Sequence, residues 1–212
     1  VTPMGGGMFV AQYTPPPPAQ HFPQLALLTA VDRRNPGKTY GHAVVPLVGQ
    51  VNFPVQGEPS SSLIVQVGKQ PFGPVPSDAS GKAKVPITVR PGTASAKLIS
   101  VVGGRRLEDP LDLKVPASKR VVLFPVGAGV PADDTVSVPV RALVTLPDGK
   151  PDTQATVSFS AGSGSVSPAV HEGNGIYSAT WTPAFGSAAS RASVQVSVAD
   201  SKGPQNDSIE LQ

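Results

Sequence analysis

One pattern of apolar and polar positions occurs three times along the chain. In each copy a glycine is followed by apolar residues at the second, fourth and sixth positions after it, and by threonine at the seventh. The three glycines are Gly7, Gly81 and Gly175. Because successive side chains of a β-strand point to opposite faces, this spacing predicts a turn glycine that leads into a strand with one buried face.

After a loop, each copy is followed by a second apolar segment, at residues 25–31, 96–102 and 192–199. Gly7 and Asp32 are separated by 25 positions, and so are Gly175 and Asp200. Equal spacing over two strands and a loop indicates an internal repeat. We interpret the glycine-led stretch as the penultimate strand of each repeated unit.

The other alternating segments complete the strand prediction, and they lie at residues 44–51, 62–68, 111–115, 121–124, 135–144, 155–159 and 207–211. Short alternating strands separated by turn residues are typical of all-β sandwiches. We therefore predict the final strands of a partial domain in residues 1–37, a β-sandwich in residues 38–116 and a second β-sandwich in residues 117–212.

Composition agrees with many short strands. The chain of 212 residues contains 22 glycines and 25 prolines, which we interpret as turn residues because valine remains frequent in alternating positions. Cysteine is absent, so the chain has no disulfide, thiolate metal site or thiol nucleophile. No apolar run is long enough to predict a membrane span. The net charge of +3 comes without a dense Lys/Arg cluster, which argues against a nucleic-acid partner.

Several stretches have a familiar order of turns and strands, and they lie at residues 77–85, 142–151, 155–160, 162–168 and 175–183. They resemble bacterial Ig-like repeats of the invasin/intimin type. The resemblance covers nearly all of the C-terminal unit and the second half of the middle unit. It implies all-β, tandem immunoglobulin-like β-sandwich domains, which in that family usually serve as rigid stalks of exported surface proteins.

No catalytic arrangement stands out in the sequence. The histidines His21, His42 and His171 fall in predicted loops or strand edges, without the spacing of metal ligands. Residues 162–165 resemble a nucleophile elbow but lack its second glycine and its helix. No phosphate-binding glycine loop precedes a helix. We therefore predict a protein without enzymatic activity, catalytic residues or a cofactor.

Two kinds of binding site remain open from the residue types alone. Carboxylates between tandem sandwiches can ligate calcium, and the candidate ligands at predicted domain ends are Asp32, Asp133, Asp134 and Asp200. Phe159, Tyr177 and Trp181 could form an aromatic platform for a sugar. The alternation instead places Tyr177 and Trp181 on the core face of their strand, and we favour core packing.

The leading functional hypothesis is a non-catalytic structural stalk or scaffold of an exported or cell-surface bacterial protein, located extracellularly, at the cell surface or in the periplasm. The alternative is an adhesin or carbohydrate-binding module that binds a glycan or a surface receptor through loops at a sandwich end. The partial domain adds an expectation about partners. Its sheet edge calls for strands from elsewhere in the same polypeptide, or from another chain by strand addition at residues 1–37, unless residues 1–36 dock on the middle domain.

Overall fold

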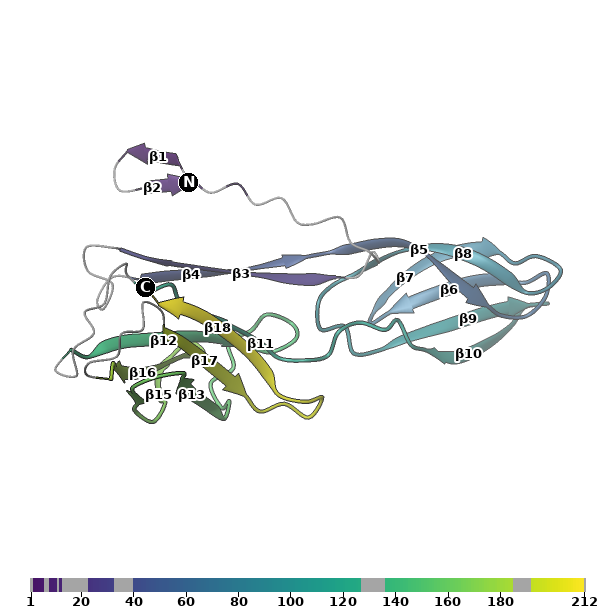
Figure 1. Cartoon of the computed structure of the whole chain (residues 1–212). Helices are drawn as coiled ribbons and strands as arrows, with labels where there is room; N and C mark the ends of the chain where they lie inside the picture. Colours follow the sequence, from purple (N-terminus) through teal and green to yellow (C-terminus); the bar gives the residue numbers. More distant parts are fainter. Residues whose placement is uncertain are drawn as a thin grey trace.

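The protein is described here from a computed structural model, which defines residues 2–5, 8–10, 12, 23–32, 40–126, 136–184 and 192–211. Every helix or strand element in these ranges is a β-strand, so the all-β prediction is confirmed. Two sandwiches follow one another along an elongated molecule, and a long hairpin lies over the C-terminal one (Figure 1). No helix in the described ranges is long and apolar enough to cross a membrane.

The C-terminal sandwich is built from β11 (Arg120–Leu123), β12 (Val138–Thr145), β13 (Val157–Ala161), β14 (Ser165–Val166), β15 (Val170–Gly173), β16 (Ile176–Thr182), β17 (Ala192–Val198) and β18 (Gln205–Leu211). One sheet has the order β11-β12-β16-β14, with β15 also paired to β16, and the other has the order β13-β17-β18. If β14 and β15 together count as the fourth strand, these orders are the A-B-E-D and C-F-G sheets of the constant-type immunoglobulin fold. The strand pairing therefore establishes an immunoglobulin-like sandwich.

Alternating side chains form the core between these two sheets. Val140, Ala142 and Val144 point inward from β12 and are at most 1% exposed. Val196 on β17 is fully buried opposite them, and Trp181 on β16 is 3% exposed. Burying one valine or leucine side chain stabilises a fold by about 1.5–3 kcal/mol, so these strands supply much of the driving force for folding.

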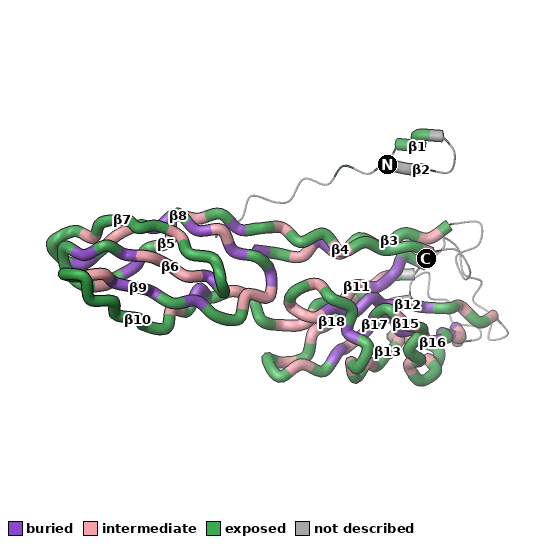
Figure 2. The backbone as a smooth tube through the Cα atoms, turned by 180° about the vertical axis from the view of Figure 1, so that it is seen from behind, coloured by how far each residue is buried: buried purple, intermediate pink, exposed green. Residues whose placement is uncertain are grey.

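The middle sandwich is built from β5 (Gly49–Gln56), β6 (Ser62–Val67), β7 (Gln70–Pro76), β8 (Lys82–Val89), β9 (Ala96–Val102) and β10 (Arg105–Leu111). Its sheets have the orders β5-β8 and β10-β9-β6-β7. Leu63 and Val65 from β6 and Val85 from β8 are fully buried between them. Figure 2 shows the consequence, with buried positions inside the sandwich and the outer strand β10 largely exposed.

The glycine-led stretches have the predicted local structure in both sandwiches. Gly81 and Gly175 adopt left-handed φ angles of +84° and +73°, and β8 and β16 begin directly after them. Our prediction that these strands are penultimate is wrong, however. A complete hairpin follows each of them, β9–β10 after β8 and β17–β18 after β16, so each is third from last.

Two further strand predictions need correction. The single strand expected at 44–51 is interrupted at Val48, where β4 ends and β5 begins. The prediction of a strand at 111–115 is also wrong, because β10 occupies Arg105–Leu111 instead. This edge strand carries charged and exposed side chains, so it lacks the apolar alternation on which the prediction relied. The proline-rich edge strand β7 was missed for the same reason.

The described part of residues 1–47 contributes two hairpins. β1 (Thr2–Gly5) pairs with β2 (Met8–Val10), and this small hairpin stands apart from the sandwiches (Figure 1). β3 (Gln24–Val31) pairs with β4 (Tyr40–Leu47) along its whole length. Only Val48 separates β4 from β5, so one nearly continuous extended segment runs from the C-terminal sandwich into the middle sandwich.

Candidate functional site

The best-defined contact region outside the cores is the surface where the β3–β4 hairpin covers the C-terminal sandwich. Leu143 on β12 and Ile176 on β16 point away from the sandwich core, yet they are only 0% and 5% exposed. They form a separate apolar cluster in which Leu27 and Val44 of the hairpin pack against them. The hairpin is therefore a third layer, and the β11-β12-β16 sheet is buried on both faces.

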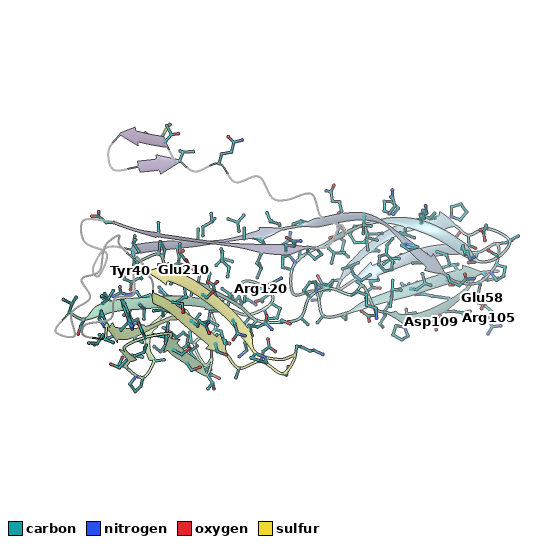
Figure 3. The ribbon with its side chains drawn as sticks, viewed as in Figure 1. Tyr40, Glu58, Arg105, Asp109, Arg120 and Glu210 are labelled. Carbon is teal, nitrogen blue, oxygen red and sulfur yellow. The ribbon has the colours of Figure 1, made fainter. Side chains whose placement is uncertain are left out.

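Three polar side chains join the hairpin to this sheet. The Tyr40 hydroxyl donates a hydrogen bond to Glu172 Oε2 at 2.8 Å. Arg141 Nε donates to the same oxygen at 3.1 Å, and the Arg141 guanidinium lies 4.4 Å from the centre of the Tyr40 ring. Tyr40 lies between the hairpin and the C-terminal sandwich (Figure 3). We call these three residues the polar latch.

The environment of the latch shifts two pKa values. Burial alone would raise the pKa of Glu172, but hydrogen bonds from Ser178, Tyr40 and Arg141 outweigh burial and hold this pKa below its ordinary value. The hydrogen bond to Glu172 raises the pKa of Tyr40, with burial acting in the same direction. The latch therefore contains an ionised Glu172 and a neutral Tyr40 around neutral pH.

Aromatic contacts extend the latch toward β11. The Tyr40 and Phe124 rings pack edge to face with centroids 5.5 Å apart, and His42 lies 6.4 Å from Phe124 in a similar geometry. Phe124 is 3% exposed, directly after β11. Edge-to-face aromatic pairs contribute about 0.5–1.5 kcal/mol beyond the area that they bury. Apolar, aromatic and ionic contacts thus all hold the hairpin on the sandwich.

A second contact region lies where the two sandwiches meet. A Cβ atom on Gly92, in the turn after β8, would lie 2.7 Å from the backbone nitrogen of Asp148, in the turn after β12. Gly149 follows Asp148 in the same turn, and a Cβ atom on it would lie 3.0–3.1 Å from Leu25 and Val44 of the hairpin. The 146–149 turn is therefore held between the middle sandwich and the hairpin. We call this contact the interdomain junction.

An open hollow adjoins the junction. It is lined mainly by residues 93–96 and 110–115 of the middle sandwich, together with Ser118 and Lys202 of the C-terminal one. Two of its charged groups, Asp112 and Lys114, form an ion pair with each other at 2.6 Å. Paired charges of this kind do not converge on a ligand, so this hollow lacks the polar focus typical of a small-molecule site.

The calcium candidates do not come together where the structure describes them. Asp200 lies in the β17–β18 turn, where its carboxylate accepts hydrogen bonds from the backbone nitrogens of Lys119 and Lys202 at 2.5 and 3.0 Å. These hydrogen bonds lower its pKa. Asp32 follows β3, and the end of β3 and the β17–β18 turn lie at opposite ends of the C-terminal sandwich (Figure 1).

Asp133 and Asp134 fall outside the described residues. In the ranges that are described, no group of three or more His, Asp or Glu side chains is arranged to hold a metal ion. The four aspartates therefore stay untested calcium candidates, which melting curves with and without a chelator would test.

The aromatic platform is ruled out for two of its three members. Tyr177 and Trp181 are 5% and 3% exposed, so the core interpretation is confirmed. Trp181 Nε1 donates to Ser163 O at 2.9 Å, and the Tyr177 hydroxyl donates to Asp152 O at 3.1 Å. Phe159 packs partly buried against the same core. Buried rings whose polar atoms are already bonded cannot stack on a sugar.

The two described histidines, His42 and His171, lie in packing contacts with aromatic rings. His42 contacts the Phe124 ring, and His171 lies 4.8 Å from the Tyr177 ring in a tilted geometry. Both contacts are packing contacts that need no proton transfer. His21 falls outside the described residues.

Sequence reasoning missed the docking of the hairpin on the β11-β12-β16 sheet, although one signal for a covered outer face is present. Ala142, Leu143 and Val144 are consecutive apolar residues, whereas a strand with one buried face should place a polar residue between the outer two. Leu143 therefore indicates a second buried face on β12. The sequence gives no sign of which segment covers that face, because Tyr40 and Glu172 are 132 positions apart.

Comparison with known proteins adds little beyond the fold. No family model matches the chain, and no curated protein matches it. Among solved structures, a crystal structure of invasin, described as a bacterial integrin-binding protein, aligns over 89% of this chain with a TM-score of 0.35 and 18% identity. The chain spans 39% of that invasin structure. The titin tandem immunoglobulin domains A164–A165 align over 91% of this chain and 89% of theirs, with a TM-score of 0.27 and 11% identity.

Proposed function

We propose that this chain is a non-catalytic rigid spacer within an exported or cell-surface bacterial protein, and that its two sandwiches act as one stiff unit. The observation that carries the proposal is the segment shared between them. β4 is fixed to the C-terminal sandwich through the latch and its apolar contacts, while β5 is paired residue by residue with β8 in the middle sandwich. A strand anchored in both sandwiches resists bending at the point where they meet.

The interdomain junction supports the same proposal. Tandem domains joined by a single linker usually move relative to one another, because few contacts cross between them. Here the Gly92 turn contacts Asp148, and the neighbouring Gly149 contacts Leu25 and Val44. The resemblance to invasin/intimin-type repeats supports the exported, surface location of the spacer.

The adhesin and carbohydrate-binding alternative draws less support from the described residues. Its aromatic platform would require Tyr177 and Trp181 at the surface, and both are core residues. The alternative then depends on ligand binding by loops at a sandwich end. Saturable binding of the intact chain on a glycan array or in a receptor pull-down would favour this alternative over the spacer.

The spacer proposal predicts one fixed distance between the two sandwiches. The chain has no cysteine, so Lys69→Cys and Gln195→Cys introduce exactly one label site into each sandwich, both at exposed positions. Spin labels at these sites should give a single narrow distance distribution in pulsed electron resonance. A broad or multi-peaked distribution would show flexible domains and would contradict the proposal.

A further inference from the structure

The outward face of the β3–β4 hairpin is apolar, and the described positions on it are exposed apart from Ala26, which is 8% exposed. Its cross-strand pairs are Ala26 with Val45, Leu28 with Ala43, and Ala30 with Gly41. Leu28 and Val45 are each 40% exposed, and this face carries no charged side chain between Ala26 and Ala30 or between Gly41 and Val45. The opposite face of the same hairpin is the one docked on the C-terminal sandwich. Both faces of β3 are thus built for burial, which explains its nearly continuous apolar sequence.

The internal repeat identifies what this outward face corresponds to. Gly7 and Asp32 match Gly175 and Asp200 at a constant offset, and the same offset places the start of β3 at the start of β17. Ala26, Leu28 and Ala30 then correspond to Val194, Val196 and Val198, all of which are 0% exposed in the C-terminal core. The uncovered face of β3 is therefore the counterpart of a core face.

The free edge of β3 leads to the same correspondence. β17 lies between two strands, with β18 on one side and β13 on the other, where Phe159 pairs with Val196. β3 pairs with β4 alone among the described strands. The place that β13 takes beside β17 thus has no described equivalent beside β3.

This edge also lacks the features that usually protect an exposed edge. Sheet edges are commonly blocked by charged residues or proline. The edge strand β10 carries Arg105, Arg106, Glu108 and Asp109, and β7 carries three prolines. β3, in contrast, contains neither a charged residue nor a proline. Among the described strands, only β4 pairs with the backbone groups of β3.

We propose that β3 accepts one additional β-strand from a different protein, not from a second copy of this chain, and that the strand is added antiparallel at the free edge of β3 as β13 is added to β17. The added strand should be uncharged, because the outward face of the hairpin carries no charged side chain to pair with it. The repeat defines its pattern further, because β13 and its preceding residues alternate apolar and small polar residues, with Ala155, Val157, Phe159 and Ala161 on one face. Backbone hydrogen bonds would supply the pairing, and alternate apolar side chains would cover Leu28.

A peptide with the sequence of residues 155–162 is a direct probe of this edge. It is added, with blocked ends, to the intact isotope-labelled chain, and backbone amide signals are followed. We expect saturable shifts concentrated in β3 and around Leu28. The same peptide carrying Val157→Asp and Phe159→Asp should give no shifts, because the receiving face offers no partner for its charges.

Variants of the chain locate the site. Leu28→Lys should abolish peptide binding, and Ala43→Lys on the neighbouring strand is a second variant in case the first does not fold. Leu107→Lys, at an equally exposed leucine on β10, should leave binding intact. Absence of saturable shifts up to about 1 mM peptide would overturn the proposal. So would self-association of the chain that Leu28→Lys abolishes, because the occupant would then be a second copy.

Discussion

At the residue scale, the polar latch shows how little of a tertiary contact is visible in sequence. Glu172 is one of several acidic residues on a turn-rich chain, and nothing in its neighbourhood distinguishes it from exposed carboxylates such as Glu108. Its partner Arg141 belongs to the same sheet, but its other partner, Tyr40, reaches it only when the hairpin docks. Docking then gives Glu172 a role in stability that depends on its charge.

Glu172→Gln should destabilise the protein in a pH-dependent way. Glu172 has a folded-state pKa below its ordinary value of 4.5, so its contribution is full above about pH 4.5 and is lost as pH falls through the folded pKa. We expect the substitution to cost about 1.5–3 kcal/mol near neutral pH, the range for hydrogen bonds to a charged group. Chemical denaturation at a series of pH values measures the difference, which should vanish in acid.

The matched control is Glu108→Gln on the surface of the middle sandwich. Glu108 also forms ion pairs, with Lys97 and Arg106 at 3.1 and 2.9 Å, but its side chain is 38% exposed. Near neutral pH its substitution should have a smaller effect than Glu172→Gln. Equal effects of the two substitutions would show that the latch is an ordinary surface ion pair.

At the scale of the element, β12 shows that period-two spacing predicts the inward face of a strand but not whether its outward face is also buried. The inward positions Val140, Ala142 and Val144 were predicted from period-two spacing and are core residues. The outward Leu143 is equally buried, but period-two reasoning assigns such a residue to solvent unless a third layer is known. The same limit applies to β10 and β7, where charge and proline hide edge strands that only pairing reveals.

Leu143→Ala should therefore cost as much as a core substitution. Truncating a buried leucine destabilises a protein by about 2–5 kcal/mol, whereas an exposed one changes stability by about 0.5 kcal/mol or less. Leu107→Ala on β10 is the control, because this leucine is 40% exposed. Denaturant unfolding compares the two. A small effect for Leu143→Ala would mean that the hairpin does not cover the sheet in solution.

At the scale of the whole molecule, sequence reasoning reached the class of fold and not the arrangement of its parts. Alternation and the glycine-led repeat predicted tandem β-sandwiches, because these features are local. The junction between the sandwiches depends on Gly92 meeting Asp148, a contact between two turns that each look ordinary in sequence. The hairpin also contacts this junction, at Gly149, and the sequence of neither turn indicates that contact.

Gly92→Ala should loosen the junction. The new Cβ would lie 2.6–2.7 Å from Asp148, and the φ angle of +71° disfavours any side chain. Gly103→Ala is the control, because Gly103 has a φ angle of +53° with nothing within 4 Å of its Cβ position. Left-handed strain of about 1–3 kcal/mol is therefore common to both substitutions.

The labelled pair at positions 69 and 195 provides the measurement. We expect Gly92→Ala to broaden or shift the distance distribution and Gly103→Ala to leave it unchanged. If both variants keep the narrow distribution of the parent chain, the junction does not fix the two sandwiches.

The docked hairpin also sets an order of events during synthesis. Tyr40 leaves the ribosome 132 residues before Glu172, which corresponds to roughly 7–26 s at typical rates of chain elongation. During that interval the sheet that receives the hairpin does not exist, and both apolar faces of the nascent hairpin are open. Docking is therefore a late step of maturation. Until then the nascent chain exposes the apolar β3–β4 hairpin, which a holding chaperone could bind.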